Sequence, residues 1–337
     1  MPTRSSHLLI RGTEEPNRGI EMGQKIFCFG AVVVDLIAQD VAVIPGPGDS
    51  ARSGSIHLAI GGCAANTATG LARLGHQVRL CGAVGDDHLG DFLRGGLEQE
   101  GVDLRHFSVH PGVQTGATFV INVEGEDRRF ISATGANDEP WPEKFDTAAL
   151  EDAAVVSFHA YGLARRPDVE DASRILKAAR SVGAITLLDV IVIPGEDLLP
   201  DLRVLLPLVD GFFPNDDEAR RLTGRADPAQ AAACLRDLGA STVVVTCGDR
   251  GLVWHSPEGC GSLAALTVET VDATGCGDAF GAGFIDAHLR DGALKEKLIC
   301  GTVLGAAVAT ASGAIDGLPD RSRFDSMMQA GVPHLVS

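Results

Sequence analysis

The chain has 337 residues, of which 45% are hydrophobic, so it can bury one large α/β domain or two medium ones and is not a disordered protein. Its 28 Lys and Arg stand against 45 Asp and Glu, which gives a formal net charge of −17, and its five lysines form no run. This charge argues against a nucleic-acid or anionic-membrane binder, because phosphodiester and lipid phosphates would be repelled. A small anionic substrate stays open, since backbone N–H groups can hold an anion inside an acidic protein.

Three features of the chain bear on its location. Residues 1–23 contain one apolar run, which is too short for a signal peptide, so we expect a loose extension and regard Met22 as an alternative start. The eight cysteines include no C-x-x-C pair and fit free thiols in a reducing compartment, so we expect a cytoplasmic protein. Residues 298–315 are uncharged, but their Gly, Ala, Thr and Ser content favours a packed interior helix over a membrane span.

Apolar runs rich in β-branched residues alternate along the chain with segments whose apolar residues recur every three or four positions. The first pattern predicts strands at 25–37, 77–84, 153–158, 184–193, 211–214 and 242–246. The second predicts helices at 65–74, 89–100, 169–182, 216–222 and 228–238. Such alternation predicts an α/β fold with a central, mostly parallel sheet and helices on both faces.

Two segments interrupt this alternation, at residues 38–61 and about 113–133, and both have the pattern of extended chain with Gly- and Pro-containing turns. We expect them to form a small β-sheet lid over a site at the carboxyl edge of the main sheet. The predicted organisation is a core domain at 24–320 that includes both lid segments, followed by a C-terminal tail at 321–337.

The strongest motif is the Gly-rich turn at 271–284, where an extended segment leads into a helix. Uncapped N–H groups at a helix start favour an oxyanion, so Gly275, Cys276 and Gly277 form a candidate anion hole. Asp278 adds a carboxylate beside it, and phosphoryl transfer to a hydroxyl needs a proton acceptor at that place. Taken alone, the turn is equally explained by a helix cap with glycines as packing spacers.

A second Gly-rich turn, at Gly61 and Gly62, opens a predicted helix that contains Asn66. Close backbone approach together with a side-chain amide suits a small polyol, whose hydroxyls need paired donors and acceptors. Turns of this kind are common, so the motif indicates a binding site only in combination with other motifs.

The two turns occur together with other short motifs, and the combination resembles the ribokinase-like, or PfkB, family of carbohydrate and nucleoside kinases. The resemblance covers the chain from about Lys25 to Pro319. It rests on Gly30 with Asp35, Pro47-Gly48-Asp49, Gly61-Gly62 with Asn66 and Leu74-Gly75, Gly85-Asp86-Asp87 with Gly90, Gly135-Ala136-Asn137, Asn215 with Glu218, Thr246-Cys247-Gly248 with Gly251, and the turn at 272–278. It implies a ribokinase-like fold and ATP-dependent phosphotransfer.

The resemblance also implies roles for the matched residues. Asp278 would be the catalytic base, and the backbone of Gly275, Cys276 and Gly277 would stabilise the transferred phosphoryl group. Substrate hydroxyls would be held by four residues: Asp35, Gly61, Gly62 and Asn66. The ATP-binding residues would be Asn215, Thr246, Gly248 and Gly251. From the residues alone, Asp35 has the alternative of ending the first strand in a turn.

Two cation sites follow from the same resemblance. Glu218, three residues after Asn215, would organise Mg²⁺ through water, and this spacing also makes a helix capping box. Asp272 and Thr274 match a monovalent-cation site of some members, so K⁺ is a candidate second ion.

We therefore expect an ATP- and Mg²⁺-dependent transfer of the γ-phosphate to a hydroxyl of a sugar or sugar-like substrate. Cys63-Ala64 stands where close ribose kinases carry Lys-Gly, and residues 157–161 lack the acidic contact of those enzymes, so His159, Tyr161, Arg128 or Arg129 could serve another polyol or an acidic sugar. The alternatives are an adenosine-like nucleoside kinase of the same family and a catalytically silent sugar- or nucleotide-binding regulator. Family members often dimerise through the lid, so a homodimer of this kind is the expected assembly.

Overall fold

The computed structural model describes residues 25–123, 125 and 128–330. The strands are β1 (Lys25–Gly30), β2 (Val33–Val41), β3 (Ser55–Gly61), β4 (Gln77–Cys81), β5 (Ala83–Gly85), β6 (Ser108–His110), β7 (Ala117–Val123), β8 (Arg129–Ala133), β9 (Ala153–Tyr161), β10 (Ile185–Val190), β11 (Gly211–Phe212), β12 (Thr242–Thr246), β13 (Leu252–Ser256) and β14 (Gly259–Leu263). The α-helices are α1 (Cys63–Arg73), α2 (His88–Gln99), α3 (Val169–Ser181), α4 (Leu199–Leu205), α5 (Asp216–Thr223), α6 (Pro228–Asp237), α7 (Cys276–Leu289), α8 (Leu294–Ala309) and α9 (Arg321–Ala330). The predicted extension at 1–23 and the last residues of the predicted tail, 331–337, lie outside the described residues.

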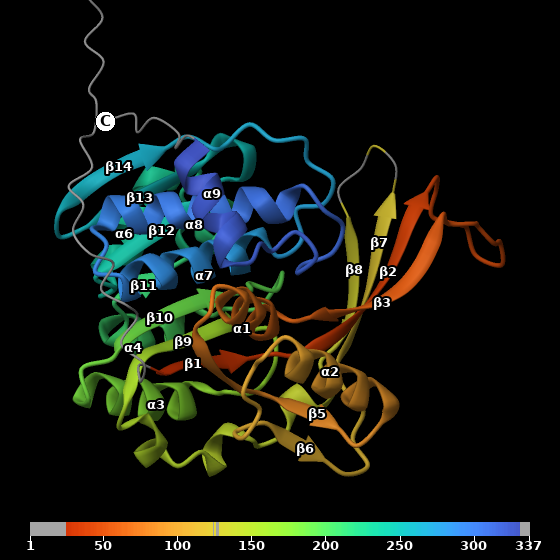
Figure 1. Cartoon of the computed structure of the whole chain (residues 1–337), viewed down its shortest axis with the longest axis horizontal. Coiled ribbons are helices and arrows are strands. Elements are labelled where there is room, and N and C mark those ends of the chain that lie inside the picture. Colours follow the sequence, from red (N-terminus) through yellow and green to blue (C-terminus); the bar gives the residue numbers. More distant parts are fainter. Residues whose placement is uncertain (1–24, 124, 126–127, 331–337) are drawn as a thin grey trace, which may run out of the picture.

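An eight-stranded sheet forms the body, in the order β14-β13-β12-β11-β10-β9-β1-β4 (Figure 1). Every pair from β12 to β4 is parallel, and only the β12–β13 and β13–β14 pairs of this sheet are antiparallel. The prediction of a mostly parallel central sheet is therefore confirmed. Its parallel strands all present their carboxyl ends at one edge, where binding sites of such sheets form.

The strands bury alternate side chains in two separate cores because successive residues of a strand point to opposite faces. Ile26 and Cys28 pack with α1, α7, α8 and α9, whereas Phe27 and Phe29 pack with α3, α4, α5 and α6. Figure 1 shows α7 and α8 on one side of the sheet and α3 and α4 on the other. Helices thus cover both faces, as the alternation of predicted elements indicated.

A four-stranded sheet, in the order β3-β2-β7-β8, stands off one side of the body (Figure 1). Its strands come from the two segments expected to form a lid, but the first begins at Val33 rather than at residue 38. The predicted strand 25–37 is in fact two strands, because the chain leaves the body sheet after Gly30. A Cβ on Gly30 would lie 2.3 Å from the carbonyl oxygen of His159, and the Asn137 side chain bonds both the N–H and the carbonyl of Val32, at 2.9 Å each.

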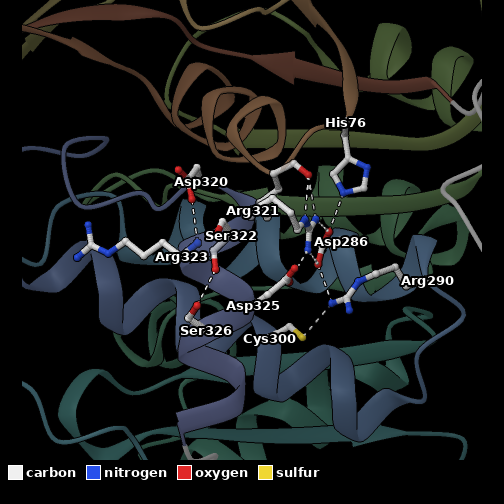
Figure 2. Close-up of polar contacts among 11 residues, drawn as sticks. His76, Asp286, Arg290, Cys300, Asp320, Arg321, Ser322, Arg323, Asp325 and Ser326 are labelled. Atoms are coloured by element: carbon white, nitrogen blue, oxygen red, sulfur yellow. Dashed lines mark hydrogen bonds and ion pairs between the residues drawn. The ribbon is translucent and has the colours of Figure 1, made fainter. Parts of the chain in front are cut away.

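The C-terminal helix α9 is held to the body by a buried ionic cluster around Asp286 of α7 (Figure 2). The Asp286 carboxylate is fully buried and meets His76 Nε2 at 2.7 Å, Arg290 at 2.7 Å and Arg321 of α9. Arg321 also donates to the carbonyl of Leu74 at the end of α1. Burial alone would raise the pKa of Asp286, but the bonds from His76 and Arg321 hold it at about 2. The cluster therefore fixes α9, α7 and the end of α1 to one another.

No helix among the described residues combines the length and the apolar character needed to cross a bilayer. Residues 298–309 of the uncharged stretch lie in α8 and pack in the body core, as predicted for an interior helix, whereas residues 310–315 follow the helix in a turn.

We expect Asp286→Asn to destabilise the protein by about 3 kcal/mol, because removing one partner of a buried ion cluster leaves the other charges buried without it. Since the native pKa of Asp286 lies below its ordinary value of 3.8, its stabilising effect is complete above about pH 4 and is lost as the pH falls toward about 2. Urea unfolding at pH 7 and pH 3 measures both effects.

The matched control is Asp325→Asn, which removes a half-exposed carboxylate 3.4 Å from the same Arg321. We expect this control to change stability by less than about 0.5 kcal/mol. Equal losses in the two variants would show that the Asp286 cluster contributes no more than a surface ion pair.

Candidate active site

The amino-terminal ends of α1 and α7 meet beneath the lid. Asn66 of α1 donates from Nδ2 to Oδ2 of Asp278 at 2.8 Å, and the hydroxyl of the adjacent Thr67 donates to the backbone carbonyl of Asp278 at 3.2 Å. These two contacts join residues more than 200 positions apart in the chain. The structure thus brings together the two Gly-rich turns that the sequence singled out separately.

Glycines allow both helix starts to come this close. Gly275, which precedes α7, has φ 79°, and a Cβ there would lie 2.6 Å from the carbonyl oxygen of Ala314. Gly62, which precedes α1, has φ 91°, and a Cβ there would lie 2.5 Å from the carbonyl oxygen of Ala31. Neither helix has a side-chain cap, and at the start of α7 the Cys276 N–H makes only a long bond, 3.4 Å, to the carbonyl of Ala273. Both helix starts can therefore receive an anion, which at α7 would replace this long bond.

Asp278 is a buried carboxylate, with 9% of its surface exposed, in the first turn of α7. Burial raises its pKa to about 6, while hydrogen bonds from Asn66 and Cys63 oppose the rise. Asn66 is also buried, and its Oδ1 has no hydrogen-bond partner among the described residues. That amide oxygen can accept a hydrogen bond from a ligand hydroxyl next to Asp278, which is the group expected to take up a proton.

Asp35 projects from lid strand β2, so the alternative that it ends the first body strand in a turn is wrong. A Cβ on Gly61 would lie 2.2 Å from Oδ2 of Asp35, so only glycine at 61 leaves space for this carboxylate. Burial, together with the charges of Asp278 and Asp272, raises the pKa of Asp35 to about 7. The lid thus brings a second carboxyl group close to Asp278.

Two further carboxyl groups lie on the body side. Glu218 and Asn215 form a capping box at the start of α5, with backbone-to-side-chain distances of 2.8 and 2.9 Å. Burial raises the pKa of Glu218 to about 7, and burial with the charges of Glu218 and Asp278 raises that of Asp189 well above its ordinary value. A divalent cation would relieve this accumulation of negative charge, so the donor set fits Mg²⁺, which binds through few carboxylates and several waters.

Asp189 was not selected by the sequence analysis. It lies near the carboxyl end of β10, one residue before the strand ends, and accepts the N–H of Ala160 at 3.1 Å. Its Oδ atom, the Asp278 carboxylate and the Cys63 Sγ all lie within 4.8 Å of one another. The signal available in the sequence was an acidic residue directly after two leucines at the end of a buried parallel strand.

The residues expected to bind the nucleotide lie at the ends of β11 and β12. Asn215 and Thr246 form a parallel bridge, and Thr246 donates its N–H to the carbonyl of Pro214 at 3.1 Å. Gly248 begins a 3-10 turn, Gly248–Arg250, and a Cβ on Gly251 would lie 2.0 Å from the carbonyl oxygen of Leu263. The four residues share this edge of the sheet with Glu218.

Asp272 and Thr274, the candidate monovalent-cation residues, take part in hydrogen bonds that hold the local backbone together. Asp272 accepts the N–H and hydroxyl of Thr274 at 2.8 and 2.7 Å through Oδ1, and the N–H of Gly313 at 3.1 Å through Oδ2. These bonds hold the turn before α7 against the segment that follows α8. A K⁺ ion at this place stays a prediction.

Of the residues noted for an unusual substrate, two belong to the body. His159 contacts the Thr67 hydroxyl through Nδ1 at 3.3 Å, and burial lowers its pKa to about 3, so it is a neutral residue beside Asp278. Tyr161 instead donates to Asp201 of α4 at 2.8 Å. A substrate role for the Tyr161 hydroxyl is therefore not supported.

The fold and the site together define a lidded α/β protein of ribokinase-like architecture, whose site combines an anion-binding helix start with a buried carboxylate. The chain belongs to the pfkB family of carbohydrate kinases, whose family model matches residues 23–321, and it is a carbohydrate kinase. The resemblance seen in the sequence is thereby confirmed.

Several known proteins are similar to the chain. The ATP-dependent ribose-1-phosphate kinase of Halopiger xanaduensis is 32% identical over 255 residues, which span 75% of this chain and 81% of that protein. The ribokinase of Haemophilus influenzae is 26% identical over 280 residues, spanning 82% of this chain and 89% of that protein. A crystal structure of a fructokinase with bound ATP from Xylella fastidiosa matches with a TM-score of 0.78 at 26% identity, over 92% of this chain and 99% of that one.

The two glycines at the start of α7 should respond differently to alanine. Gly275→Ala places a Cβ against the backbone of Ala314 at positive φ, so we expect a loss of about 2 kcal/mol or more. Gly277→Ala, in the same helical turn, meets no atom within 4 Å and should leave stability unchanged or raise it by up to about 1 kcal/mol. Thermal unfolding of both variants tests this difference, and similar melting temperatures would refute it.

Proposed function

We propose that the protein transfers the γ-phosphate of ATP, in the presence of Mg²⁺, to a hydroxyl of a sugar or sugar phosphate. The observation that carries this proposal is the buried Asp278 carboxylate in the uncapped first turn of α7, bonded to an Asn66 amide whose oxygen is left without a partner. A proton acceptor, an anion-binding helix start and a hydroxyl-binding amide then occupy one place.

In the proposed reaction, Asp278 takes the proton of the acceptor hydroxyl as its oxygen bonds to the γ-phosphorus. The bond from that phosphorus to the β,γ-bridging oxygen breaks, and ADP leaves with the electron pair. The N–H groups of Gly275, Cys276 and Gly277 offset the negative charge on the phosphoryl oxygens. Asp35 and Asn66 orient the acceptor, with Gly61 and Gly62 allowing its close approach.

Asn215, Thr246, Gly248 and Gly251 are proposed to bind the nucleotide along the edge they share. Glu218 is proposed to hold Mg²⁺ through water, with Asp189 as a second carboxylate facing the ion. When bound, Mg²⁺ would neutralise charge on the phosphate oxygens. The lid excludes water from this region, which suppresses hydrolysis of ATP.

The substrate class rests on the lid surface that faces the site. Strand register places Asp35, Thr118 and Ser132 on one face, and the hydroxyls of Thr118 and Ser132 lie 3.1 Å apart. These polar groups suit a polyol better than a flat base. A panel of sugars, sugar phosphates and nucleosides, assayed for ADP release, tests the class; a clear preference for nucleosides would favour the nucleoside-kinase alternative, and binding without ADP release the regulator.

Asp278→Asn should lower kcat by about 10³-fold or more, because the amide cannot accept the hydroxyl proton. Nucleotide affinity should stay within about threefold of the wild type, since the amide keeps the shape of the carboxylate. Steady-state kinetics and calorimetric titration with ADP measure the two effects. A variant with nearly normal kcat would remove Asp278 from the proposed mechanism.

The activity should fall at acid pH, because Asp278 acts as a carboxylate and its pKa is about 6. Asp35 and Glu218, with pKa values of about 7, lose charge over a neighbouring interval, so the decline in kcat/KM should begin near pH 7 and steepen below 6. Asn66→Ala removes a hydrogen bond that stabilises the charged form of Asp278, so the steep part should move to higher pH. An unmoved profile would contradict the assignment.

We also propose that two copies associate through the outer face of the lid. The register aligns Leu58, Leu36, Phe119 and Ile131 in one row across the four strands, on the face opposite Asp35. Ile131 is 68% exposed and Leu58 44%, so this apolar row is open to solvent in one chain. A flat apolar sheet face can pack on its own copy about a two-fold axis, which would cover it.

Leu58→Asp should convert this dimer to monomers, because a symmetric interface would bury two unpaired carboxylates, one from each copy. Light scattering on a sizing column measures the mass. The control is Val204→Asp, which alters an equally exposed apolar residue of α4, on the body rather than the lid, and should leave the assembly unchanged. A wild-type monomer at micromolar concentration would overturn the proposed assembly.

A further inference from the structure

Two adjacent lid arginines, Arg128 and Arg129, differ in the face of the lid to which they belong. In β8, Ser132 pairs with Thr118, which in turn pairs with Asp35, so Ser132 belongs to the face toward the body. Arg128, four residues before Ser132, has the same parity, whereas Arg129 pairs with Ile121 on the opposite face. Arg128 immediately precedes β8, and extending the alternation by this one residue assigns it to the inner face of the lid.

The contacts of Arg128 agree with this assignment. Its Nε lies 3.9 Å from Oδ1 of Asp272, and the two side chains are only 25% and 3% exposed. Asp272 belongs to the turn that leads into α7, six residues before Asp278. The positive charge of Arg128 also reaches Cys276, the first residue of α7, where it opposes the rise that burial causes in the thiol pKa. The guanidinium thus lies beside the proposed anion hole.

A cation at this position would offset the negative charge of the site. Asp35, Asp189, Glu218 and Asp278 gather there, and their pKa values are all raised by burial. A triphosphate would add more negative charge to this group. An arginine suits this place because its planar fork can donate two N–H bonds to phosphoryl oxygens and it keeps its charge when partly buried.

We propose that Arg128 is a catalytic residue that the lid delivers to the phosphoryl group during transfer. This inference rests on the proposed function. As the acceptor oxygen bonds to the γ-phosphorus, the bond to the β,γ-bridging oxygen breaks and the hydroxyl proton passes to Asp278. Arg128 then donates N–H bonds to the equatorial oxygens of the moving group, on the side opposite the α7 amides. It exchanges its contact with Asp272 for these oxygens.

The lid also contacts the body close to the turn that Arg128 approaches. Gln39 of β2 donates to the Ser312 hydroxyl in the segment after α8, next to Gly313, which donates its N–H to Asp272. The lid therefore touches the body at the same turn that Arg128 approaches. Closure over a substrate and placement of the guanidinium become one event, so the chemical step would depend on the closed lid.

Arg128→Gln, Arg128→Lys and the control Arg129→Gln test the proposal. Arg128→Gln should lower kcat by about 100-fold or more, with both KM values within about threefold, because the contact is made mainly in the transition state. Arg128→Lys should recover part of the loss, since it restores charge without the fork. Arg129→Gln should stay within about twofold of the wild type. Thermal unfolding checks that all three variants are folded.

A binding measurement complements the kinetics. In calorimetric titrations with Mg²⁺, Arg128→Gln should bind ADP as the wild type does but should lose about 100-fold in affinity when aluminium fluoride is added to mimic the moving phosphoryl group. Arg129→Gln should lose neither. Equal effects in the Arg128 and Arg129 variants, or unchanged kcat in Arg128→Gln, would overturn the proposal. So would a rise in acceptor KM alone, which would assign Arg128 to an anionic group of the acceptor.

The proposal and the function on which it rests can fail separately. A wild-type protein that phosphorylates no member of the substrate panel contradicts the proposed function. In that case the titration with ADP and aluminium fluoride still tests Arg128, because that complex mimics the moving phosphoryl group and needs no turnover. An Arg128→Gln variant that binds ADP with aluminium fluoride as tightly as the wild type does, or that loses affinity for ADP alone to the same extent, would overturn the role of Arg128 as well.

Discussion

The hydrogen bond from Asn66 to Asp278 is the contact on which the arrangement of the site depends. It joins the first turns of α1 and α7. The glycine before each helix has a positive φ angle, which permits this close approach. The opposite end of the pair is fixed by Asp286 of α7, which His76 and Arg321 connect to the end of α1 (Figure 2). The two helices are therefore held at both ends, and the orientation of the Asp278 carboxylate follows from that.

The second constraint is electrostatic. The protein places four carboxyl groups, Asp35, Asp189, Glu218 and Asp278, where burial disfavours their charged forms. Such a site is poised to exchange protons for a divalent ion and to bind neutral hydroxyl groups. The anion-binding helix starts lie in the same space, so attraction for phosphate and repulsion among carboxylates act side by side. A ligand that carries its own metal ion satisfies both.

Much of this was accessible from the chain itself. The alternation of apolar periods predicted the layered sheet, since hydrophobic spacing reports directly on which faces are buried. The turns at 61–62 and 272–278 were found because they occur together with other short motifs in one order along the chain, whereas each turn alone has an ordinary structural explanation. Asp189 escaped notice because a single acid after a buried apolar run is a weak signal, and its position near Asp278 and Cys63 appears only in the tertiary structure. The boundary at Gly30 was missed because the exit of the chain into the lid is decided by His159 and Asn137, which are distant in sequence.

The sequence by itself determined many of the body strands and helices, the fold family and the residues of the two Gly-rich turns, because propensity, periodicity and turn chemistry are local properties. Only the tertiary structure decided which of those residues meet. The pairing of Asn66 with Asp278, the approach of Asp35 from the lid and the raised pKa values of the buried acids all arise from contacts between segments far apart in the chain. Burial and distance set these quantities, and both depend on how segments far apart in the sequence pack together.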